Sequence, residues 1–417
     1  MEFTEITIKE YQKFWENHPL KTFLSSPNIS KLREKSGYDI SFVGIKKNKK
    51  IIAAALLTSK TKLLKKKEFY APRGFLVDFN DQKIVDFFVK KLKKYIKEQN
   101  GFILRIDPYV YYKQRDIDGN IVPDGFDNSE VVKHLMKIGF KQVPEQDFEQ
   151  VGWMFSLDLK DKTEEEILQE MRPNTRNIIR RSERFGIVIR ELKKDELPRF
   201  LSIMESTGER RNFSIRNLNY FETMYDLFSK KDEIKYLVTE LNLKDYIKKL
   251  EDEINEKQTK IDKLSDSSHN DKQKKVLHED IKVLESKTKK TKDIRKEKNT
   301  DTITLSGSMF IMTKPEVTYL SSGNYKEFLS FNSQYLIQWE MIKYGIKNGY
   351  EKYNFYGIPA DINKKPKDYG IYEFKRGFNG YVEELIGEFE LPISNVYYIN
   401  KMMKKIKSLI KKKKTER

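Results

Sequence analysis

The chain has 417 residues, a length that exceeds one hydrophobic core and predicts two domains. Its 81 Lys and Arg against 63 Asp and Glu give a formal net charge of +18, which favours a polyanionic partner such as nucleic acid or an anionic membrane. The lack of cysteine excludes disulfides, thiolate catalysis and cysteine-bound zinc. The four histidines are widely spaced and no metalloprotease, P-loop or serine-hydrolase motif occurs, so we expect neither a metal nor a nucleophilic serine.

The start of the chain carries acidic residues and lacks the apolar core of a signal peptide. The longest uninterrupted apolar run, Ile51–Leu57, is too short to cross a bilayer. We therefore expect a cytoplasmic protein.

The first 110 residues follow the order helix, hairpin, helix, strand. A short helix is expected over 9–18, followed by a hairpin over Asp39–Leu57. Apolar residues at helical spacing predict a helix over Asp81–Lys97. The next strand, Phe102–Ile106, is closed by Asp107 and a proline.

The same order of elements recurs in the second half of the chain. Two strands, a helix and a closing strand are expected there, over Tyr236–Leu241, Thr302–Met312, Ser333–Lys347 and Tyr353–Tyr356. Ala53 and Pro108 stand 55 positions apart, and Ser306 and Pro359 stand 53 apart. This agreement predicts two copies of one α/β domain, at 1–157 and 158–400, with chance agreement between common elements as the alternative.

An insertion at 242–300 interrupts the second copy where the first has only a turn. It contains no Gly or Pro, and its apolar residues recur at heptad spacing in two rows, separated by the polar stretch 265–270. The first row holds Ile247, Leu250, Ile254, Ile261 and Leu264, and the second holds Leu277, Ile281 and Leu284. The insertion therefore predicts an antiparallel helical hairpin.

The return helix of this insertion is basic. Its last part, Lys287–Lys298, holds seven Lys or Arg against two acids. A coiled-coil arm is usually a structural element or a protein contact, whereas a basic arm also suits RNA phosphates. Both interpretations stay open at this point.

Residues 351–380 combine an aromatic strand, a polar loop and a second apolar run, which we interpret as a second strand that begins at Gly370. Lys375 interrupts this run beside Phe374. Burial of a cation there is costly unless it meets an anion. The lysine therefore lies either on an edge strand facing solvent or in a site.

Other candidate residues stand outside this window. Arg172, Arg176 and Arg180 lie at i, i+4 and i+8 on one face of an expected helix, although a basic face is often simply solvated. Asp107 ends a strand, where open α/β sheets hold ligands, or else only forms the turn before a proline.

Two further stretches place an arginine among aromatic residues. Arg73, within 70–78, forms either a chain corner or a phosphate contact. Arg216 and Tyr220 are four positions apart and would share one face of a helix.

The C-terminal stretch 401–417 is basic and amphipathic. It holds nine Lys or Arg and one acid, interspersed with Met402, Met403, Ile406, Leu409 and Ile410. This pattern fits a helix that lies on anionic lipid, and it equally fits a solubilising tail.

Several of these motifs, in this order, resemble the FemABX family of peptidyltransferases that build peptidoglycan cross-bridges. The motifs are YAPRGFLVD (70–78), LRIDPYV (104–110), TGERRNFSIRNLNYF (207–221), TYLSSGN (318–324), QWEMIKYGIKNGYEKYNFYGI (338–358) and YEFKRGFNGYVEELIGEF (372–389). The insertion resembles the arm of FemA-type and MurM/MurN-type members, which is itself similar to the tRNA-binding arm of seryl-tRNA synthetase. The resemblance implies an α+β fold of two GNAT-like domains with an inserted antiparallel coiled-coil arm.

The resemblance also implies an activity and its partners. The expected reaction moves Gly, Ala or Ser from aminoacyl-tRNA to an amino group of a peptidoglycan precursor, either lipid II or a UDP-linked pentapeptide. No cofactor is expected, because the aminoacyl ester is already activated. Peripheral contact with the inner face of the plasma membrane and a related Fem-type partner or homodimer are further expectations.

Individual residues match the motifs of the family. Lys35 and Arg216 match its basic contacts to the precursor, with Tyr220 beside them. By the same resemblance, Asp107 matches the Asp of the strand-end motif, and Phe374 and Lys375 match the Phe-Lys pair. Further candidate contacts to the substrate are Arg73 and Tyr319. The candidate contacts to tRNA are Arg172, Arg176, Arg180, Lys287, Lys289 and Lys290. Ser321 departs from the family, which often has a second aromatic two positions after the tyrosine at 319.

The chemistry gives two of these residues expected roles. The attacking amine must lose a proton and the tetrahedral intermediate carries an oxyanion. Asp107 is the candidate that orients or receives the proton, and Lys375 the candidate that stabilises the oxyanion or a terminal tRNA phosphate.

Three alternatives remain. The same chemistry serves self-immunity against cell-wall endopeptidases in some family members. An acyl-CoA N-acetyltransferase on the same fold is a second alternative, although neither domain has a glycine-rich pyrophosphate loop. A non-catalytic RNA- or membrane-binding protein is the third.

Overall fold

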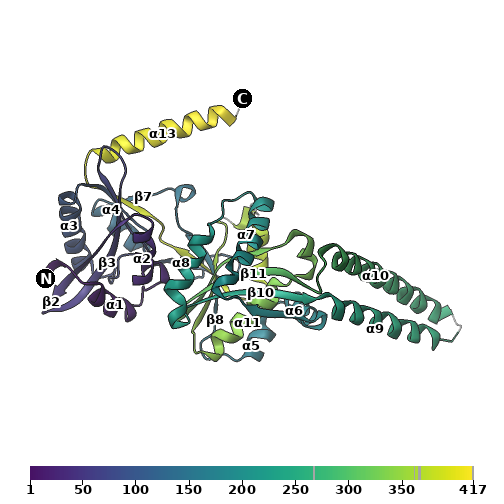
Figure 1. The fold of residues 1–417 in the computed structure, drawn as a ribbon. Coiled ribbons are helices and arrows are strands. Elements are labelled where there is room, and N and C mark those ends of the chain that lie inside the picture. The colour runs from purple at the N-terminus through teal and green to yellow at the C-terminus, as the bar shows by residue number, and fades with distance from the viewer. Residues whose placement is uncertain (266–267, 361, 365–367, 416–417) are drawn as a thin grey trace.

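The computed structural model describes residues 1–265, 268–360, 362–364 and 368–415. Two β-sheets with helices on their faces form the body, and helical elements project from it at two places (Figure 1). The projecting elements are the paired helices α9 (Leu243–Asp262) and α10 (Ser268–Lys298), and the C-terminal helix α13 (Val396–Thr415). Among the described helices, none is both long and apolar enough to span a bilayer.

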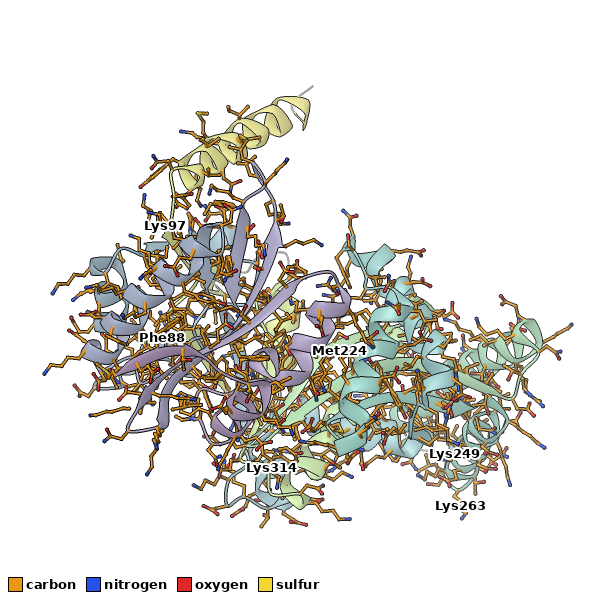
Figure 2. All side chains as sticks on the ribbon, turned by 60° about the vertical axis from the view of Figure 1, so that its left-hand side comes forward. Phe88, Lys97, Met224, Lys249, Lys263 and Lys314 are labelled. Atoms are coloured by element: carbon orange, nitrogen blue, oxygen red, sulfur yellow. The ribbon has the colours of Figure 1, made fainter. Side chains whose placement is uncertain are left out.

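The first sheet has seven strands and is buried on both faces. In β3, Ala53, Ala55 and Leu57 pack into the core that includes helix α3, whereas Ala54 and Leu56 pack on the opposite side with helix α1. Figure 2 shows Phe88 of α3 inside this part of the molecule and Lys97 of the same helix at its periphery. The strands, in sheet order, are β1 (Glu2–Glu5), β2 (Asp39–Lys47), β3 (Lys50–Thr61), β4 (Lys67–Ala71), β5 (Gly101–Ile106), β15 (Phe389–Pro392) and β7 (Lys141–Gln142).

The second sheet has eight strands, also covered on both faces. Tyr236 and Val238 of β10 pack against helices α7 and α8, and the intervening Leu237 packs into the core on the other face, where α6 and α11 lie. This is the period of two that a strand imposes. The strands, in sheet order, are β6 (Tyr111–Gln114), β14 (Tyr381–Leu385), β8 (Trp153–Asp158), β13 (Lys352–Gly357), β12 (Glu316–Asn324), β11 (Thr302–Thr313), β10 (Ile234–Asn242) and β9 (Ile187–Glu191).

The helices of the body connect these strands. Their bounds are α1 (Ile8–Glu16), α2 (Pro27–Lys35), α3 (Gln82–Glu98), α4 (Ser129–Lys137), α5 (Glu164–Glu170), α6 (Pro173–Phe185), α7 (Leu197–Arg211), α8 (Leu218–Phe228), α11 (Gln334–Lys347) and α12 (Tyr369–Arg376).

The predicted repeat is visible in the strand pairing. Strands β2, β3 and β4 pair antiparallel in sequence, and β5 then pairs parallel to β4 after helix α3. Strands β10 to β13 repeat this pattern, with α11 as the crossover helix. The expected class, two α/β domains with an inserted helical arm, is confirmed.

The arm leaves the sheet at the β10–β11 connection, where the first copy has a tight turn. That turn is formed by Asn48 and Lys49, both with positive φ, as the hairpin geometry requires. Leu250 of α9 and Leu284 of α10 are buried between the arm helices. The ion pair Lys257–Asp280, at 2.7 Å, also joins the two helices. The antiparallel hairpin predicted from the heptad rows is confirmed.

The two sheets exchange strands. Strand β15, near the end of the chain, pairs antiparallel with β5 in the first sheet. Strand β6, from the first third of the chain, pairs with β14 in the second sheet. Residues from both sides of the expected division at 157 therefore contribute to each sheet.

One predicted element is wrong. The apolar run after Gly370 forms helix α12 and not a strand. Tyr372 and Lys375 lie on its buried face, while Glu373 and Arg376 form an i, i+3 ion pair at 3.3 Å. A short apolar run does not distinguish a helix from a strand by its period, which explains the error.

Candidate active site

One cavity of the second sheet lies where strands β12 and β13 separate. Their parallel pairing ends at Thr318 and Asn354, although both strands continue beyond these residues. The cavity that opens there, which we call the β12–β13 cavity, has a volume of about 740 Å³. Its walls include Tyr319, Phe374 and Lys375, three of the residues expected from the sequence.

A second cavity of about 350 Å³ lies between helix α2 and helix α8. We call it the α2–α8 cavity. Arg216 and Tyr220 line it, and the Arg216 guanidinium lies 5.3 Å from the centroid of the Tyr220 ring. The two cavities share four lining residues, Phe213, Leu320, Ser321 and Tyr356. They are therefore two chambers with a common wall.

Lys375 is buried in the wall of the β12–β13 cavity, with an exposed fraction of 4%. Its Nζ donates to the carbonyl oxygens of Tyr356, at 3.2 Å, and Gly357, at 2.5 Å. Burial lowers the pKa of this ammonium to about 7. The neighbouring Phe374 packs edge-on against Tyr335, with ring centroids 4.7 Å apart. The alternative of an edge-strand lysine facing solvent is therefore wrong.

Tyr356 ends strand β13 in an unusual conformation. Its φ is +63°, a left-handed backbone that bulky residues rarely adopt. Its amide nitrogen donates to Oδ1 of Asn354 at 2.7 Å. Burial raises the pKa of its phenol, although the positive charge of Arg73 opposes the shift. The phenol therefore stays protonated at neutral pH.

Asp107 and Arg73 form a buried pair next to Tyr356. The Arg73 amide donates to Oδ1 of Asp107 at 2.8 Å, and Nη1 of Arg73 lies 3.5 Å from Oδ2. Each residue is 2% exposed. Burial raises the pKa of Asp107 to about 6, although the Arg73 guanidinium opposes the shift. Neither residue is among those that line the two cavities.

A profile of the FemAB family matches residues 6–405. The aminoacyltransferase FemA of Staphylococcus aureus strain N315 is 30% identical over 423 residues, which cover 98% of this chain and 100% of that protein. The chain belongs to the FemAB family. FemA of the bovine strain RF122 / ET3-1 gives the same identity and coverage. A crystal structure of FemX, 24% identical, superposes with a TM-score of 0.72 over 95% of this chain and 99% of FemX.

Membership of the FemAB family makes the chain an aminoacyltransferase. No group of three or more His, Asp or Glu that could hold a metal ion occurs among residues 1–265, 268–360, 362–364 and 368–415.

Lys35, which was expected to contact the precursor, is exposed at the end of α2 and does not line the cavity beside it. Arg33, two residues earlier on the same helix, does line it. Its guanidinium lies 5.4 Å from the ring centroid of Tyr38. The sequence did not single out Arg33. Arg33 and Lys35 are both basic and stand two positions apart, so what distinguishes them is the direction in which each side chain points from the helix.

The three arginines expected on one helical face have different environments. Arg172 precedes α6 as its N-cap residue and pairs with Glu373 at 3.3 Å. Arg176 donates to the carbonyl oxygens of Gln169 and Met171. Arg180 is exposed on α6. The structure therefore assigns two of them intramolecular contacts, and their role toward tRNA stays a prediction.

The arm lysines Lys287, Lys289 and Lys290 are exposed along α10. Thr288, which stands between Lys287 and Lys289, and Thr291, which follows Lys290, are buried. The basic residues thus face outward from the coiled coil. Their contact with tRNA also stays a prediction.

Three residues of the β12–β13 cavity were not singled out from the sequence. Arg210 and Arg211, at the end of α7, line it together with Tyr356. Burial, with a smaller effect of Arg211, lowers the pKa of the Arg210 guanidinium. The two arginines lie in the motif 207–221 and Tyr356 lies in the motif 338–358, but nothing within these motifs distinguishes the three residues from their neighbours.

Proposed function

We propose that this FemAB-family chain transfers an amino acid, namely Gly, Ala or Ser, from aminoacyl-tRNA to an amino group of a peptidoglycan precursor. The observation that carries this proposal is the pair of chambers with a common wall. A transfer between two large substrates needs two adjoining binding sites whose reacting ends meet. The four shared lining residues mark that meeting point.

The α2–α8 cavity is proposed to hold the precursor. Arg33 and Arg216 both line it, one from each half of the chain. Two guanidinium groups suit a diphosphate, because each offers planar N–H donors to phosphate oxygens. Both a lipid-linked precursor and a UDP-linked pentapeptide carry that group.

The β12–β13 cavity is proposed to hold the aminoacylated end of the tRNA. Arg210, Arg211 and Lys375 line it, with Asp368 as an acidic counterpart near Arg211. This basic lining suits the terminal phosphate, and the aromatic rings of Tyr319 and Tyr335 offer stacking surfaces for a base.

Asp107, which is buried and lines neither cavity, is proposed to orient the attacking amine or to receive its proton. Lys375, in the wall of the β12–β13 cavity, is proposed to act on the tetrahedral intermediate or a terminal phosphate. The aminoacyl ester supplies the activated acyl group, so aminoacyl-tRNA is a co-substrate and the protein need supply no nucleophile of its own.

The arm is proposed to hold the body of the tRNA. It projects from the second sheet (Figure 1), and its residues Lys287, Lys289 and Lys290 are exposed. Exposed lysines along a helix suit the phosphate backbone without reading its sequence.

Contact with an anionic membrane at the inner face of the plasma membrane is proposed for helix α13. Its root is fixed, because Tyr397 is buried and Lys401 pairs with Glu390 of β15 at 2.7 Å. Beyond the root, Met402 and Ile406 are exposed on a helix that projects from the body (Figure 1). Exposed apolar residues among lysines suit the headgroup region of an anionic bilayer.

The transferase proposal is tested by mixing the purified chain with a panel of charged tRNAs and either lipid II or the UDP-linked pentapeptide, followed by mass spectrometry of the precursor. The expected result is a mass increase of one amino-acid residue with at least one donor. No increase with any combination would contradict the proposal. Acetyl-CoA in place of tRNA tests the N-acetyltransferase alternative in the same assay.

A further inference from the structure

We propose that Gln150 is a further binding residue for the precursor, and that the buried carboxylate of Glu388 positions it. The inference rests on the proposed function, because it concerns the α2–α8 cavity assigned to the precursor. It adds a neutral contact to the two arginines of that cavity. Neither Gln150 nor Glu388 is among the site residues expected from the sequence.

The first observation is the place of Gln150 in the cavity wall. Gln150 is half-buried and lines the α2–α8 cavity, as Arg33 and Arg216 do. Among the described residues that line this cavity, it is the one with a carboxamide. This carboxamide forms no hydrogen bond with any part of the chain that the structure describes. Its two N–H donors and its carbonyl acceptor are therefore available to a ligand.

The second observation is the way in which the main chain of 149–151 is held. Oε1 of Glu388 accepts from the amides of Glu149 and Gln150, each at 2.7 Å. On the other side of Gln150, Nη2 of Arg73 donates to the carbonyl oxygen of Val151 at 3.0 Å. Hydrogen bonds to a charged partner are the strong ones. The amide of Gln150 is occupied by Glu388, so the carboxamide is the only group through which Gln150 can donate to a ligand.

The third observation is that Glu388 is itself anchored. Its other oxygen, Oε2, accepts from Nη2 of Arg105 at 3.1 Å. Arg105 lies in the central part of the first sheet, on β5, and both side chains are buried. The carboxylate thus uses one oxygen to hold the loop and the other to bind the sheet. This division supports a positioning role for Glu388, since the cavity does not contact it directly.

The chemistry of the carboxamide indicates which part of the precursor it binds. The two guanidinium groups of the cavity suit the diphosphate, whereas a carboxamide suits a neutral amide, to which it can donate and from which it can accept. A peptidoglycan precursor carries neutral amides in two places, namely the acetamido group of its sugar and the peptide bonds of its stem. The group recognised by Gln150 is a neutral amide at one of these places.

The first test is calorimetric titration of Gln150→Ala with the UDP-linked pentapeptide. We expect the Kd to rise roughly 3- to 10-fold over wild type, as for the loss of one neutral hydrogen bond. The UDP-linked sugar without the peptide forms the second arm. An equal rise there assigns the contact to the sugar, and a rise confined to the full precursor assigns it to the stem. Gln146→Ala is the matched control, because Gln146 is exposed nearby and lines neither cavity. An unchanged Kd for both ligands would overturn the proposal.

The second test separates positioning from stability. Glu388→Gln keeps a carbonyl oxygen for the two amides but loses the charge that faces Arg105, whereas Glu388→Leu accepts nothing. We expect both variants to unfold at lower temperature, but only Glu388→Leu to raise the Kd of the precursor as Gln150→Ala does. Glu384→Leu is the control, because Glu384 pairs with Arg115 at 2.5 Å and lines neither cavity. A Kd that rises equally in both Glu388 variants would overturn the positioning role.

A double-mutant cycle tests whether Glu388 acts through Gln150. Glu388→Leu added to Gln150→Ala should raise the Kd no further, and multiplied effects would show that Glu388 acts by another route. Because binding is measured directly, a wild type that binds the precursor but forms no product would contradict the proposed function, and the Kd comparison would still decide this inference. A wild type that does not bind the precursor would overturn this inference as well.

Discussion

The Nζ of Lys375 donates to the carbonyl oxygen of Tyr356 at 3.2 Å and thereby ties helix α12 to the end of strand β13. This contact brings together a residue expected from the sequence and one that was not. It also joins the β12–β13 cavity to the wall that it shares with the α2–α8 cavity.

The buried carboxyl of Asp107 predicts an acidic limb in the pH profile. Its pKa is raised to about 6, with Arg73, Tyr70 and Glu388 as the titratable groups that act on it. Below pH 6 the carboxyl is protonated and Arg73 loses its charged partner, so we expect kcat/KM to fall tenfold per pH unit there. Asp107→Asn should have low activity at all pH values and lack this limb. A wild-type profile that is flat from pH 5 to 7 would contradict the assignment.

The raised pKa of Asp107 also predicts the direction in which the free energy of unfolding changes with pH. The folded state holds its proton up to about pH 6 and the unfolded chain only to about 3.8, so folding takes up protons between these values. The contribution of Asp107 to the free energy of unfolding therefore decreases as pH rises through this window. Urea denaturation of wild type and Asp107→Asn at pH 4.5 and 7 measures the difference in their free energies of unfolding. Relative to wild type, the Asp107→Asn variant is expected to be more stable at pH 7 than at pH 4.5.

Arg216→Met is expected to weaken binding of the precursor. Loss of one charge-assisted hydrogen bond to phosphate costs about 1.5–3 kcal/mol, which corresponds to roughly a 10- to 100-fold rise in the precursor's KM. The value of kcat should change little, because Arg216 lies in the α2–α8 cavity away from the common wall. Lys97→Met, on the exposed side of α3, is the control. A fall in kcat at unchanged KM would refute a binding role.

The arm lysines are expected to act on tRNA affinity through charge. Replacing Lys287, Lys289 and Lys290 with Glu should raise the Kd for tRNA and reduce the slope of log Kd against log salt by about 2. Fluorescence anisotropy at several salt concentrations measures both quantities. The matched control replaces Lys90, Lys93 and Lys97 of α3, which are equally exposed. Equal effects of the two triple variants would show that only net charge matters.

Helix α13 is expected to bind anionic vesicles. Met402→Asp with Ile406→Asp places charges on its exposed apolar side and should abolish sedimentation with phosphatidylglycerol vesicles. The control, Val276→Asp with Val283→Asp, alters two exposed apolar residues of another projecting helix. Unchanged sedimentation of the first variant would exclude α13 as the membrane contact.

Lys352 is expected to be important for stability. Its ammonium lies 2.7 Å from Glu316 and 3.1 Å from Glu383. Lys352→Met leaves both carboxylates without this partner, which for buried pairs costs about 3–5 kcal/mol of unfolding free energy. The exposed i, i+3 pair Lys133–Glu130 provides the control, because solvent screens it and Lys133→Met should change the unfolding free energy little. Chemical denaturation measures both values.

Much of the fold could be predicted because local periodicity determines it. The stripe of Phe88, Leu92 and Ile96 defines α3, and the heptad rows define the arm. The apolar run around Phe374 is too short to show a period, and α12 was therefore missed. Strand exchange could not be predicted either, because the four residues of β15 pair with residues almost 300 positions earlier.

The site was predictable only where a residue type is unusual for its surroundings. A lysine beside Phe374 and an aspartate at the end of β5 are conspicuous in sequence, and both are buried at the site. Tyr356 is one aromatic residue among several in the sequence. No sequence pattern reveals its left-handed backbone or its place in the wall between the two cavities. Arg33 and Lys35 are both basic, and only the packing of α2 distinguishes them.

The position of β15 beside β5 has a consequence for biosynthesis. Strand β5 is complete after residue 106, but its neighbour β15 spans residues 389–392 and is synthesised almost 300 residues later. The N-terminal sheet therefore stays open along one edge while those residues are made, a state that is prone to association with other chains. The first sheet is completed only when the second half of the chain has been synthesised.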